Sequence, residues 1–310
     1  MTSAIASLPF LGSGLGYRAE IRQQVLAAAG AIDFVEIITE RYTGHPALWR
    51  DLDAACERFQ VIPHGVSLSI GSARPAERDH LRAVRRVSDR TRSPYYSEHL
   101  ALTGVPGIDL GHLSPLWFTE QSLAIVARNV RQVQDTLEKP LVLENVTYHF
   151  ELPLSQMSQA EFFHRLVAAT GCGLLLDVTN IHTNATNHHF DPLAFLESMP
   201  LAAVVQVHVA GGYFHDGFLI DGHCAPVAEE SWRLLEALAA RTAVRGVLLE
   251  HDDQFPEFPV LLDQVARARR IIRRQDDGPD GKPEIRPGLL QTSHAAPRLR
   301  SCPDTAPDRA

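Results

Sequence analysis

The sequence predicts an α/β protein, a closed (β/α)₈ barrel in a single domain that covers residues 1–274. Eight short apolar runs rich in β-formers alternate along the chain with longer amphipathic segments, and this alternation is typical of parallel βαβ units. Eight such units favour a closed barrel over an open sheet. The glycine-rich stretch Gly12–Gly16 lacks the spacing of a dinucleotide-binding fingerprint, so we expect it to serve close backbone packing.

The predicted strands are four to eight residues long, as buried parallel strands usually are. They span Leu11–Tyr17, Asp33–Ile38, Val61–Leu68, Tyr95–Leu100, Leu141–Val146, Gly173–Val178, Val204–Val209 and Val247–Glu250.

The segments between these runs repeat apolar residues with a helical period. The predicted helices span Tyr17–Ala29, Asp51–Arg58, Ala76–Asp89, Thr119–Leu137, Gln159–Thr170, Pro192–Glu197, Ala228–Ala240 and Phe258–Ile272. Termination signals support the boundaries of one helix in particular. Ser158 precedes Glu161 with the spacing of a capping box, and Gly171 follows the last helical residue.

Composition excludes several classes of protein. The 29 Lys and Arg residues against 37 Asp and Glu residues give a formal charge of −8, which argues against nucleic-acid binding through a basic surface. The sequence has no apolar run of about 18 residues and no signal-peptide pattern, so we expect no membrane association. The four cysteines lie far apart, which suits a reducing cytoplasm; they are Cys56, Cys172, Cys224 and Cys302.

The segment 275–310 differs from the rest of the chain. It is rich in proline and has no apolar periodicity, so we predict a disordered tail. A tail that binds a partner is the alternative.

Histidines and carboxylates follow the predicted strands where each strand ends. Because the carboxyl ends of barrel strands meet at one rim, these side chains should converge there. The candidates are His64, His99, Glu144, Asp177, Asn180, His208 and Glu250 at strand ends, and Asp221 and His223 in the loop after the seventh strand. Glu36, near the end of the second strand, is also a candidate to face the barrel interior.

One histidine or aspartate at a strand end is commonly a structural residue, but a ring of them indicates metal. Buried acids repel one another unless cations lie between them. Imidazole and carboxylate without thiolate suit Fe, Mn or Zn, and the number of donors is enough for two or three ions. Glu144 can bridge two ions through its two oxygens. Asp221 and His223, two positions apart, would project to the same side of an extended segment.

At these same residues the chain resembles a known family, the multinuclear non-haem iron-dependent oxidative enzymes, which includes the methanobactin-maturation oxidase. The similarity covers roughly residues 8–270. The matching stretches are HGVSLSIGSARP from His64, YYSEHLALTG from Tyr95, LVLENVTYH from Leu141, GCGLLLDVTNIHTNATNHHFDPL from Gly171, VVQVHVAGG from Val204, LIDGHCAPV from Leu219 and LLEHDDQFPEF from Leu248.

The resemblance implies a barrel that holds two or three iron ions, mixed Fe²⁺ and Fe³⁺, and uses O₂ as co-substrate to oxidise a cysteine in a ribosomally synthesised precursor peptide, a step of natural product biosynthesis. It also implies a small partner protein that recognises the leader of the peptide. The implied metal ligands are His64, His99, Glu144, Asp177, Asn180, His208, Asp221, His223 and Glu250, of which Glu144, Asp177, His208 and Glu250 are the expected catalytic residues.

Two other functions remain open at this point. The first is a divalent-metal sugar isomerase, epimerase or endonuclease-type barrel, which would not need O₂. The second is a metal-binding accessory protein without catalytic activity. If the substrate is a peptide, loops at the rim should form an open groove, with aromatic contacts from Tyr213, Phe214 and Phe255; the alternative is that these rings only pack the loops against the barrel.

Overall fold

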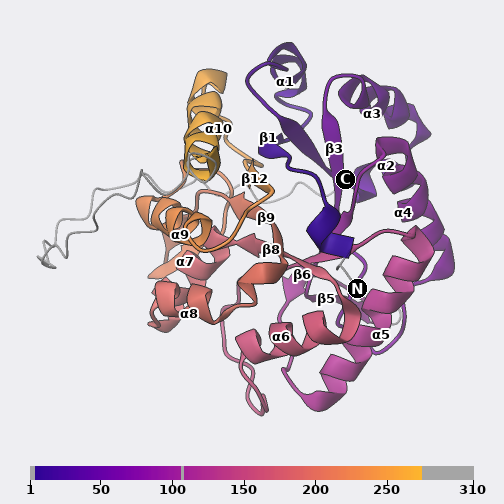
Figure 1. Ribbon diagram of the computed structural model, residues 1–310, viewed down its shortest axis with the longest axis vertical. Helices are drawn as coiled ribbons and strands as arrows, with labels where there is room; N and C mark the ends of the chain where they lie inside the picture. The colour runs from indigo at the N-terminus through magenta and orange to yellow at the C-terminus, as the bar shows by residue number, and fades with distance from the viewer. Residues whose placement is uncertain (1–3, 106–107, 274–310) are drawn as a thin grey trace, which may run out of the picture.

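Eight parallel strands close into a barrel in the computed structural model, which describes residues 4–105 and 108–273 (Figure 1). This confirms the predicted fold class. The prediction of a disordered tail at 275–310 lies outside the described residues. Around the barrel the strands follow chain order, and β1 pairs with β12 to close it. The barrel strands are β1 (Gly12–Gly16), β2 (Phe34–Ile38), β3 (Gln60–Gly65), β4 (Tyr96–His99), β7 (Leu141–Glu144), β8 (Gly173–Asp177), β9 (Val204–Val209) and β12 (Gly246–Leu249).

Helices form the outer layer around the strands (Figure 1). They are α1 (Arg22–Ala27), α2 (Glu40–Thr43), α3 (Trp49–Cys56), α4 (Arg78–Thr91), α5 (Glu120–Leu137), α6 (Gln159–Thr170), α7 (Val178–His188), α8 (Pro192–Ser198), α9 (Glu229–Ala239) and α10 (Phe258–Arg273). The described part of the chain also has three short 3₁₀ turns, at Ala4–Ser7, Pro46–Leu48 and Leu201–Ala203. No helix within the described ranges combines the length and the apolar character that crossing a membrane requires.

The first helix is shorter than the sequence predicts. It begins at Arg22 rather than at Tyr17, because Tyr17, just past the end of β1, is still hydrogen-bonded to the neighbouring strand: its backbone N–H donates to the carbonyl of Glu36 at 2.7 Å. The following residue, Arg18, is buried. The chain therefore reaches the rim of the barrel before it turns into α1.

The other helix signals in the sequence match the structure closely. At the start of α6, the Ser158 hydroxyl accepts a hydrogen bond from the backbone N–H of Glu161 at 3.1 Å. At its end, Gly171 has a φ of +69°, the left-handed conformation that glycine adopts without strain. The glycine-rich strand β1 also has a packing reason, because a Cβ on Gly14 would lie 2.7 Å from the ring of Phe34.

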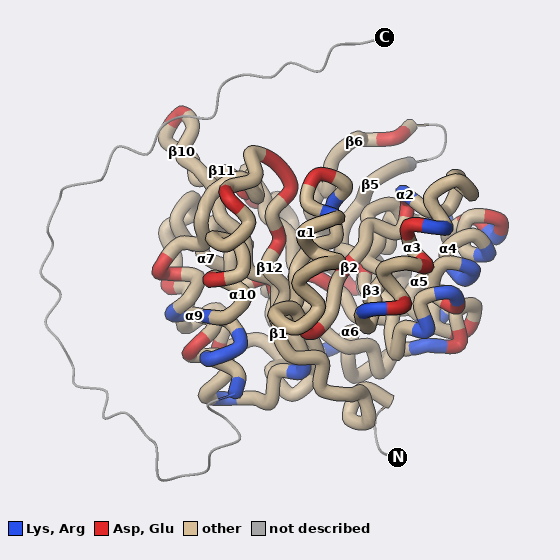
Figure 2. Tube along the Cα trace, turned by 90° about the horizontal axis from the view of Figure 1, so that it is seen from above, with Lys and Arg blue, Asp and Glu red and all other residues tan. Residues whose placement is uncertain are grey.

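Two antiparallel hairpins interrupt the barrel pattern, and the sequence analysis did not predict them. One joins β5 (Leu102–Val105) to β6 (Ile108–Ser114), and the other joins β10 (Tyr213–His215) to β11 (Phe218–Ile220). Each lies between a barrel strand and the next helix, so both belong to the carboxyl-terminal face. Figure 2 shows them projecting from the same end of the molecule, opposite the N-terminal residues.

Candidate metal centre

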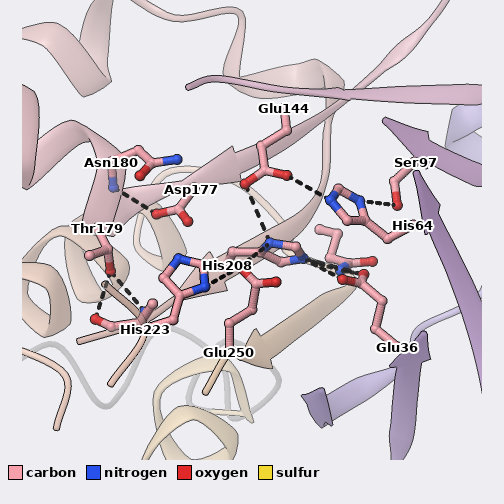
Figure 3. Close-up of polar contacts among 12 residues, drawn as sticks. Glu36, His64, Ser97, Glu144, Asp177, Thr179, Asn180, His208, His223 and Glu250 are labelled. Carbon is pink, nitrogen blue, oxygen red and sulfur yellow. Dashed lines mark hydrogen bonds and ion pairs between the residues drawn. The ribbon is translucent and has the colours of Figure 1, made fainter. Parts of the chain in front are cut away.

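The predicted strand-end residues lie together inside the carboxyl-terminal rim of the barrel (Figure 3). Register explains why neighbouring strands bring their side chains to one level. His99 on β4 is paired with Glu144 on β7, and Asp177 on β8 is paired with His208 on β9. Glu250 follows the last residue of β12. All five of these residues are at most 9% exposed, so the site is a buried polar cluster in an otherwise apolar barrel.

Glu144 lies between three histidines. Its Oε2 atom is 3.3 Å from the Nε2 atom of His64 and 3.3 Å from the Nε2 atom of His99. Its Oε1 atom faces the other way and is 3.4 Å from the Nδ1 atom of His208. The two oxygens of this carboxylate thus face different groups of nitrogen ligands.

The donor atoms form overlapping groups that could hold metal ions. Within the described residues, each group has its candidate ligand atoms within 4.8 Å of one another. The groups are His64, His99 and Glu144; Glu144, Asp177, His208 and Glu250; and His223, Glu250 and Asp252. Glu144 and Glu250 each belong to two groups, so the cluster is continuous across the rim.

Asp221 and His223 also converge, but not through the predicted extended backbone. The Nε2 atom of His223 is 2.9 Å from Oδ1 of Asp221. His223 has a φ of +47°, in the left-handed region, so the chain turns sharply here and an extended segment was the wrong explanation. Two residues that the sequence analysis did not identify as site residues lie beside this pair. They are Asp252, 2.9 Å from His223 Nδ1, and Arg18.

Asn180 reaches the cluster from a helix rather than from the strand end that the sequence suggested. The chain passes from β8 into α7 without a loop, and Asp177 is the N-cap residue of that helix. Its Oδ1 atom accepts the backbone N–H of Asn180 at 2.8 Å. The Asn180 amide donates to the carbonyl of Asn145 at 3.0 Å. This bond directs the amide group and leaves its oxygen for another partner.

Each histidine of the cluster turns one ring nitrogen toward Glu144 or Asp221, and its other ring nitrogen contacts a different oxygen atom. Such outer contacts fix the tautomer and the ring orientation of metal-binding histidines. The contacts are His64 Nδ1 to Ser97 Oγ at 2.9 Å, His99 Nδ1 to the Gly65 carbonyl at 3.0 Å, His208 Nε2 to Glu36 Oε1 at 3.2 Å and His223 Nδ1 to Asp252 Oδ2 at 2.9 Å. Glu36 therefore faces the barrel interior as expected, as a partner of His208 rather than of the central carboxylates.

Several atoms that point into the cluster lack hydrogen bonds, although buried polar atoms normally have them. Among the residues that the structure describes, six such atoms are buried without a hydrogen-bond partner: Glu144 Oε2, Asp177 Oδ2, Asn180 Oδ1, His208 Nδ1, Asp221 Oδ1 and His223 Nε2. They are oxygen and nitrogen donors with free lone pairs, once the imidazoles are neutral. The set therefore fits cations of the Fe, Mn or Zn type, and the buried cluster could bind metal.

Several residues of the cluster also have pKa values that are shifted from their ordinary values. Burial, together with the charges of Asp221 and Glu144, raises the pKa of Asp177 well above its usual range. Burial alone would lower the pKa of His208, but the carboxylates around it, Glu250 foremost, raise it well above its ordinary value. The His64 imidazole, by contrast, has its pKa lowered by burial and by the neighbouring histidines. The directions of these shifts reflect the crowding of carboxylates in one buried site.

The three aromatic side chains that we expected to contact a peptide at the rim differ in their surroundings and exposure. Phe214, on the β10–β11 hairpin, is 58% exposed. Tyr213 packs over Gly222, where a Cβ would lie 2.5 Å from its ring, and the ring of Phe255 lies against His251 with 5.4 Å between centroids. Only Phe214 of the three rings therefore has the exposure that contact with an extended peptide requires.

Comparison with solved structures supports the fold alone. The chain is similar to D-psicose 3-epimerase from Clostridium cellulolyticum H10, solved with D-tagatose, with a TM-score of 0.53 and 13% identity over 84% of this chain and 93% of that one. It is similar to D-allulose 3-epimerase from Methylomonas sp., solved with D-allulose, with a TM-score of 0.52 and 14% identity over 87% and 99% of the two chains. Both are sugar epimerases, but identities this low carry no information about activity.

Sequence relatives match more strongly and over the whole barrel. A UPF0276 protein from Caulobacter vibrioides is 39% identical over 273 residues, which covers 86% of this chain and 97% of the relative. A UPF0276 protein from Shewanella oneidensis is 36% identical, covering 81% and 91%. The model of the RiPP precursor modification enzymes MbnB/TglH/ChrH matches residues 12–273; RiPPs are ribosomally synthesised and post-translationally modified peptides. The chain therefore belongs to the MbnB/TglH/ChrH family of RiPP precursor modification enzymes.

Proposed function

We propose that this protein is an iron enzyme that uses O₂ to oxidise a cysteine in a ribosomally synthesised precursor peptide. The observation that carries the proposal is the position of Glu144, whose two oxygens face two separate groups of nitrogen ligands. Such a carboxylate suits adjacent metal ions. Membership of the family supplies the peptide as substrate.

We assign two or three iron ions, mixed Fe²⁺ and Fe³⁺, to the overlapping donor groups. The proposed ligands are His64, His99, Glu144, Asp177, Asn180, His208, Asp221, His223 and Glu250, and six of them carry a buried donor atom without a hydrogen-bond partner in the described residues. Iron bound there would supply redox chemistry with O₂ and a Lewis-acidic position for the cysteine sulfur.

The residues of the chain have three tasks in this proposal. The carboxylates Glu144, Asp177 and Glu250 neutralise the charge of the ions and, with His208, are the residues expected to contact the reacting atoms. Ser97, Glu36 and the carbonyl of Gly65 hold the imidazoles in the required tautomers. The apolar barrel beneath the cluster excludes water from one side of it.

The substrate and partner follow from the same assignment. A cysteine-containing precursor peptide must reach the carboxyl-terminal rim, and the exposed Phe214 offers it an apolar contact there. We expect a small leader-recognition protein to deliver the peptide. Neither a nucleic acid nor a membrane has a part in this reaction.

A reconstitution experiment tests the proposal. Purified protein is loaded with Fe²⁺ without oxygen and mixed with a cysteine-containing peptide encoded beside its gene, with and without a leader-recognition protein encoded there. Oxygen is then admitted. We expect oxygen consumption and a mass change confined to a cysteine-containing fragment, measured by an oxygen electrode and by mass spectrometry.

The same experiment distinguishes the other two functions. Turnover of the peptide without O₂, or at an equal rate with Zn²⁺ in place of iron, would contradict the oxidative proposal. Epimerisation of a ketose sugar by the Mn²⁺-loaded protein would favour the isomerase-type alternative. Tight metal binding with no product from any peptide of the gene neighbourhood would favour the accessory protein.

A further inference from the structure

Arg18 is a buried cation at the edge of the metal centre. It follows the end of β1 and is only 5% exposed. Its Nε atom donates to Oδ1 of Asp252 at 2.5 Å, and its Nη2 atom lies 3.6 Å from Oε1 of Glu250. The absence of a side chain at Gly16 leaves room for the guanidinium, since a Cβ there would lie 3.1 Å from Nη1. The first strand thus delivers one positive charge to a rim that is otherwise acidic.

Asp252 connects this cation to His223. Its second oxygen, Oδ2, accepts from Nδ1 of His223 at 2.9 Å, and its backbone N–H donates to the carbonyl of His223 at 2.8 Å. The opposite ring nitrogen of His223, Nε2, faces Oδ1 of Asp221 at 2.9 Å. The four side chains form a line that runs from Arg18 through Asp252 and His223 to Asp221.

The position of His223 makes such an anchor necessary. The inner histidines project from barrel strands, and groups on other barrel strands hold their rings, as Ser97 holds His64 and Glu36 holds His208. His223 lies in a loop between β11 and α9, with a left-handed φ of +47°. Loop side chains are less constrained than strand side chains, so its ring orientation depends on the carboxylate that receives its Nδ1–H.

We propose that Arg18 and Asp252 are positioning residues that fix His223 with Nδ1 protonated and Nε2 directed, beside Asp221, at an outer metal ion. The inference rests on the proposed function in assigning an ion to the Asp221–His223 pair. Asp252 belongs to the donor group of His223 and Glu250, and we assign it to positioning rather than to the ion because Arg18 holds one of its oxygens and His223 holds the other. Arg18 acts through Asp252: its Nε–H holds that carboxylate, while its Nη2 atom lies beside Glu250.

The proposal predicts a selective effect on one ion. The inner groups, centred on Glu144, do not contain Asp252, which makes D252N the most selective variant; Arg18 also lies 3.6 Å from Glu250, a residue that the inner and outer groups share. Loss of a hydrogen-bond partner that orients a metal ligand weakens metal affinity by about 10–100-fold. The outer ion should therefore be bound more weakly, while the inner ions should stay bound.

The experiment measures iron per chain in D252N, R18Q and R18K after anaerobic loading with Fe²⁺ and dialysis. The matched controls are D253N, the adjacent exposed aspartate, and R22Q, whose side chain pairs with Asp51 instead. We expect one ion fewer than wild type in all three test variants and the wild-type count in both controls. R18K should not recover the ion, because lysine keeps the charge but has a single nitrogen, which cannot take the places of both Nε beside Asp252 and Nη2 beside Glu250. Circular dichroism confirms folding, and D252N, altered at a partly exposed carboxylate, tests the proposal should R18Q not fold.

A second measurement reports the protonation and the metal binding of the two ring nitrogens of His223. In the Zn²⁺-loaded protein labelled with ¹⁵N-histidine, His223 should show one metal-bound Nε2 and one protonated Nδ1, assigned by their absence in H223A. In D252N this pair of signals should be lost, while the inner histidines keep theirs. A purely structural role for Asp252 would leave the signals of His223 unchanged.

The outcomes separate this inference from the proposed function. Wild-type iron counts in R18Q and D252N, or wild-type counts in R18K, would overturn the positioning role even if the peptide is oxidised. Loss of one ion together with the His223 signals would support it even if no peptide is oxidised. Loss of every ion in D252N would also contradict it, because the inner groups would then depend on Asp252.

Discussion

Replacement of Glu144 by alanine should remove two iron ions from the protein, whereas replacement of His64 should remove at most one. The reason is the placement of the carboxylate. Oε2 of Glu144 faces His64 and His99, and Oε1 faces His208. A carboxylate offers two oxygens to two ions, while a histidine turned toward the centre through one nitrogen serves only one.

The size of the effect follows from the donor groups. Glu144 is one of three donors in the group with His64 and His99, and one of four in the group with Asp177, His208 and Glu250. Loss of a hydrogen-bond partner that orients a ligand lowers the metal affinity of a site by about 10–100-fold. Loss of a direct ligand should lower it by at least about 100-fold. A 100-fold loss corresponds to about 2.8 kcal/mol at each ion. The H64A variant should show that loss at one ion and E144A at two.

The assay is elemental analysis of folded protein after anaerobic loading and dialysis against a weak chelator. Glu40→Gln is a suitable control, because Glu40 is a partly buried carboxylate of the rim whose Oε1 accepts the backbone N–H of Val66 at 3.0 Å and which belongs to none of the donor groups. It should keep the full iron count. Equal single losses in E144A and H64A would refute a bridging role, and so would a full count in E144A.

Three further predictions address the metal, the substrate contact and the fold. Iron should support peptide turnover and zinc should not, although purified samples can hold zinc because occupancy follows availability as well as preference; rates measured with each metal decide this. Phe214→Ala should raise the KM for the peptide without changing the iron count, whereas Phe10→Ala, similarly exposed but preceding β1, should change neither; an unchanged KM in both variants would count against the contact. Ser158→Ala should lower the free energy of unfolding by about 1 kcal/mol, measured with urea, because it removes the cap of α6.

Local patterns in the sequence were sufficient for the barrel and for most of the rim. Strand and helix periods are properties of consecutive residues, so the eight barrel strands and the cap of α6 could be predicted without any tertiary information. Once the strands are parallel, their carboxyl ends must share one rim. The convergence of His64, Glu144 and His208 therefore followed from the positions of these residues at strand ends.

The hairpins and the helix that begins directly after Asp177 could not be predicted in this way. Asp177 reads as the end of a strand, and its second role as the N-cap of α7 depends on where its side chain points. The β10–β11 hairpin is only three residues deep on each side, too short for a clear period-2 pattern. Both features position ligands, since α7 carries Asn180 and the hairpin leads into Asp221.

The sequence by itself determined most of the residues that the rim contains, because strand ends and residue types are local information, but Arg18 and Asp252 were missed. Only the tertiary structure decided how they face one another. That Glu144 turns its two oxygens to different histidines, that His208 is oriented by Glu36 and His223 by Asp252, and that Arg18 lies beside Asp252 are relations between residues up to 234 positions apart. Such relations depend on the closure and register of the barrel, which place distant strand ends a few ångströms apart, and no local pattern encodes them.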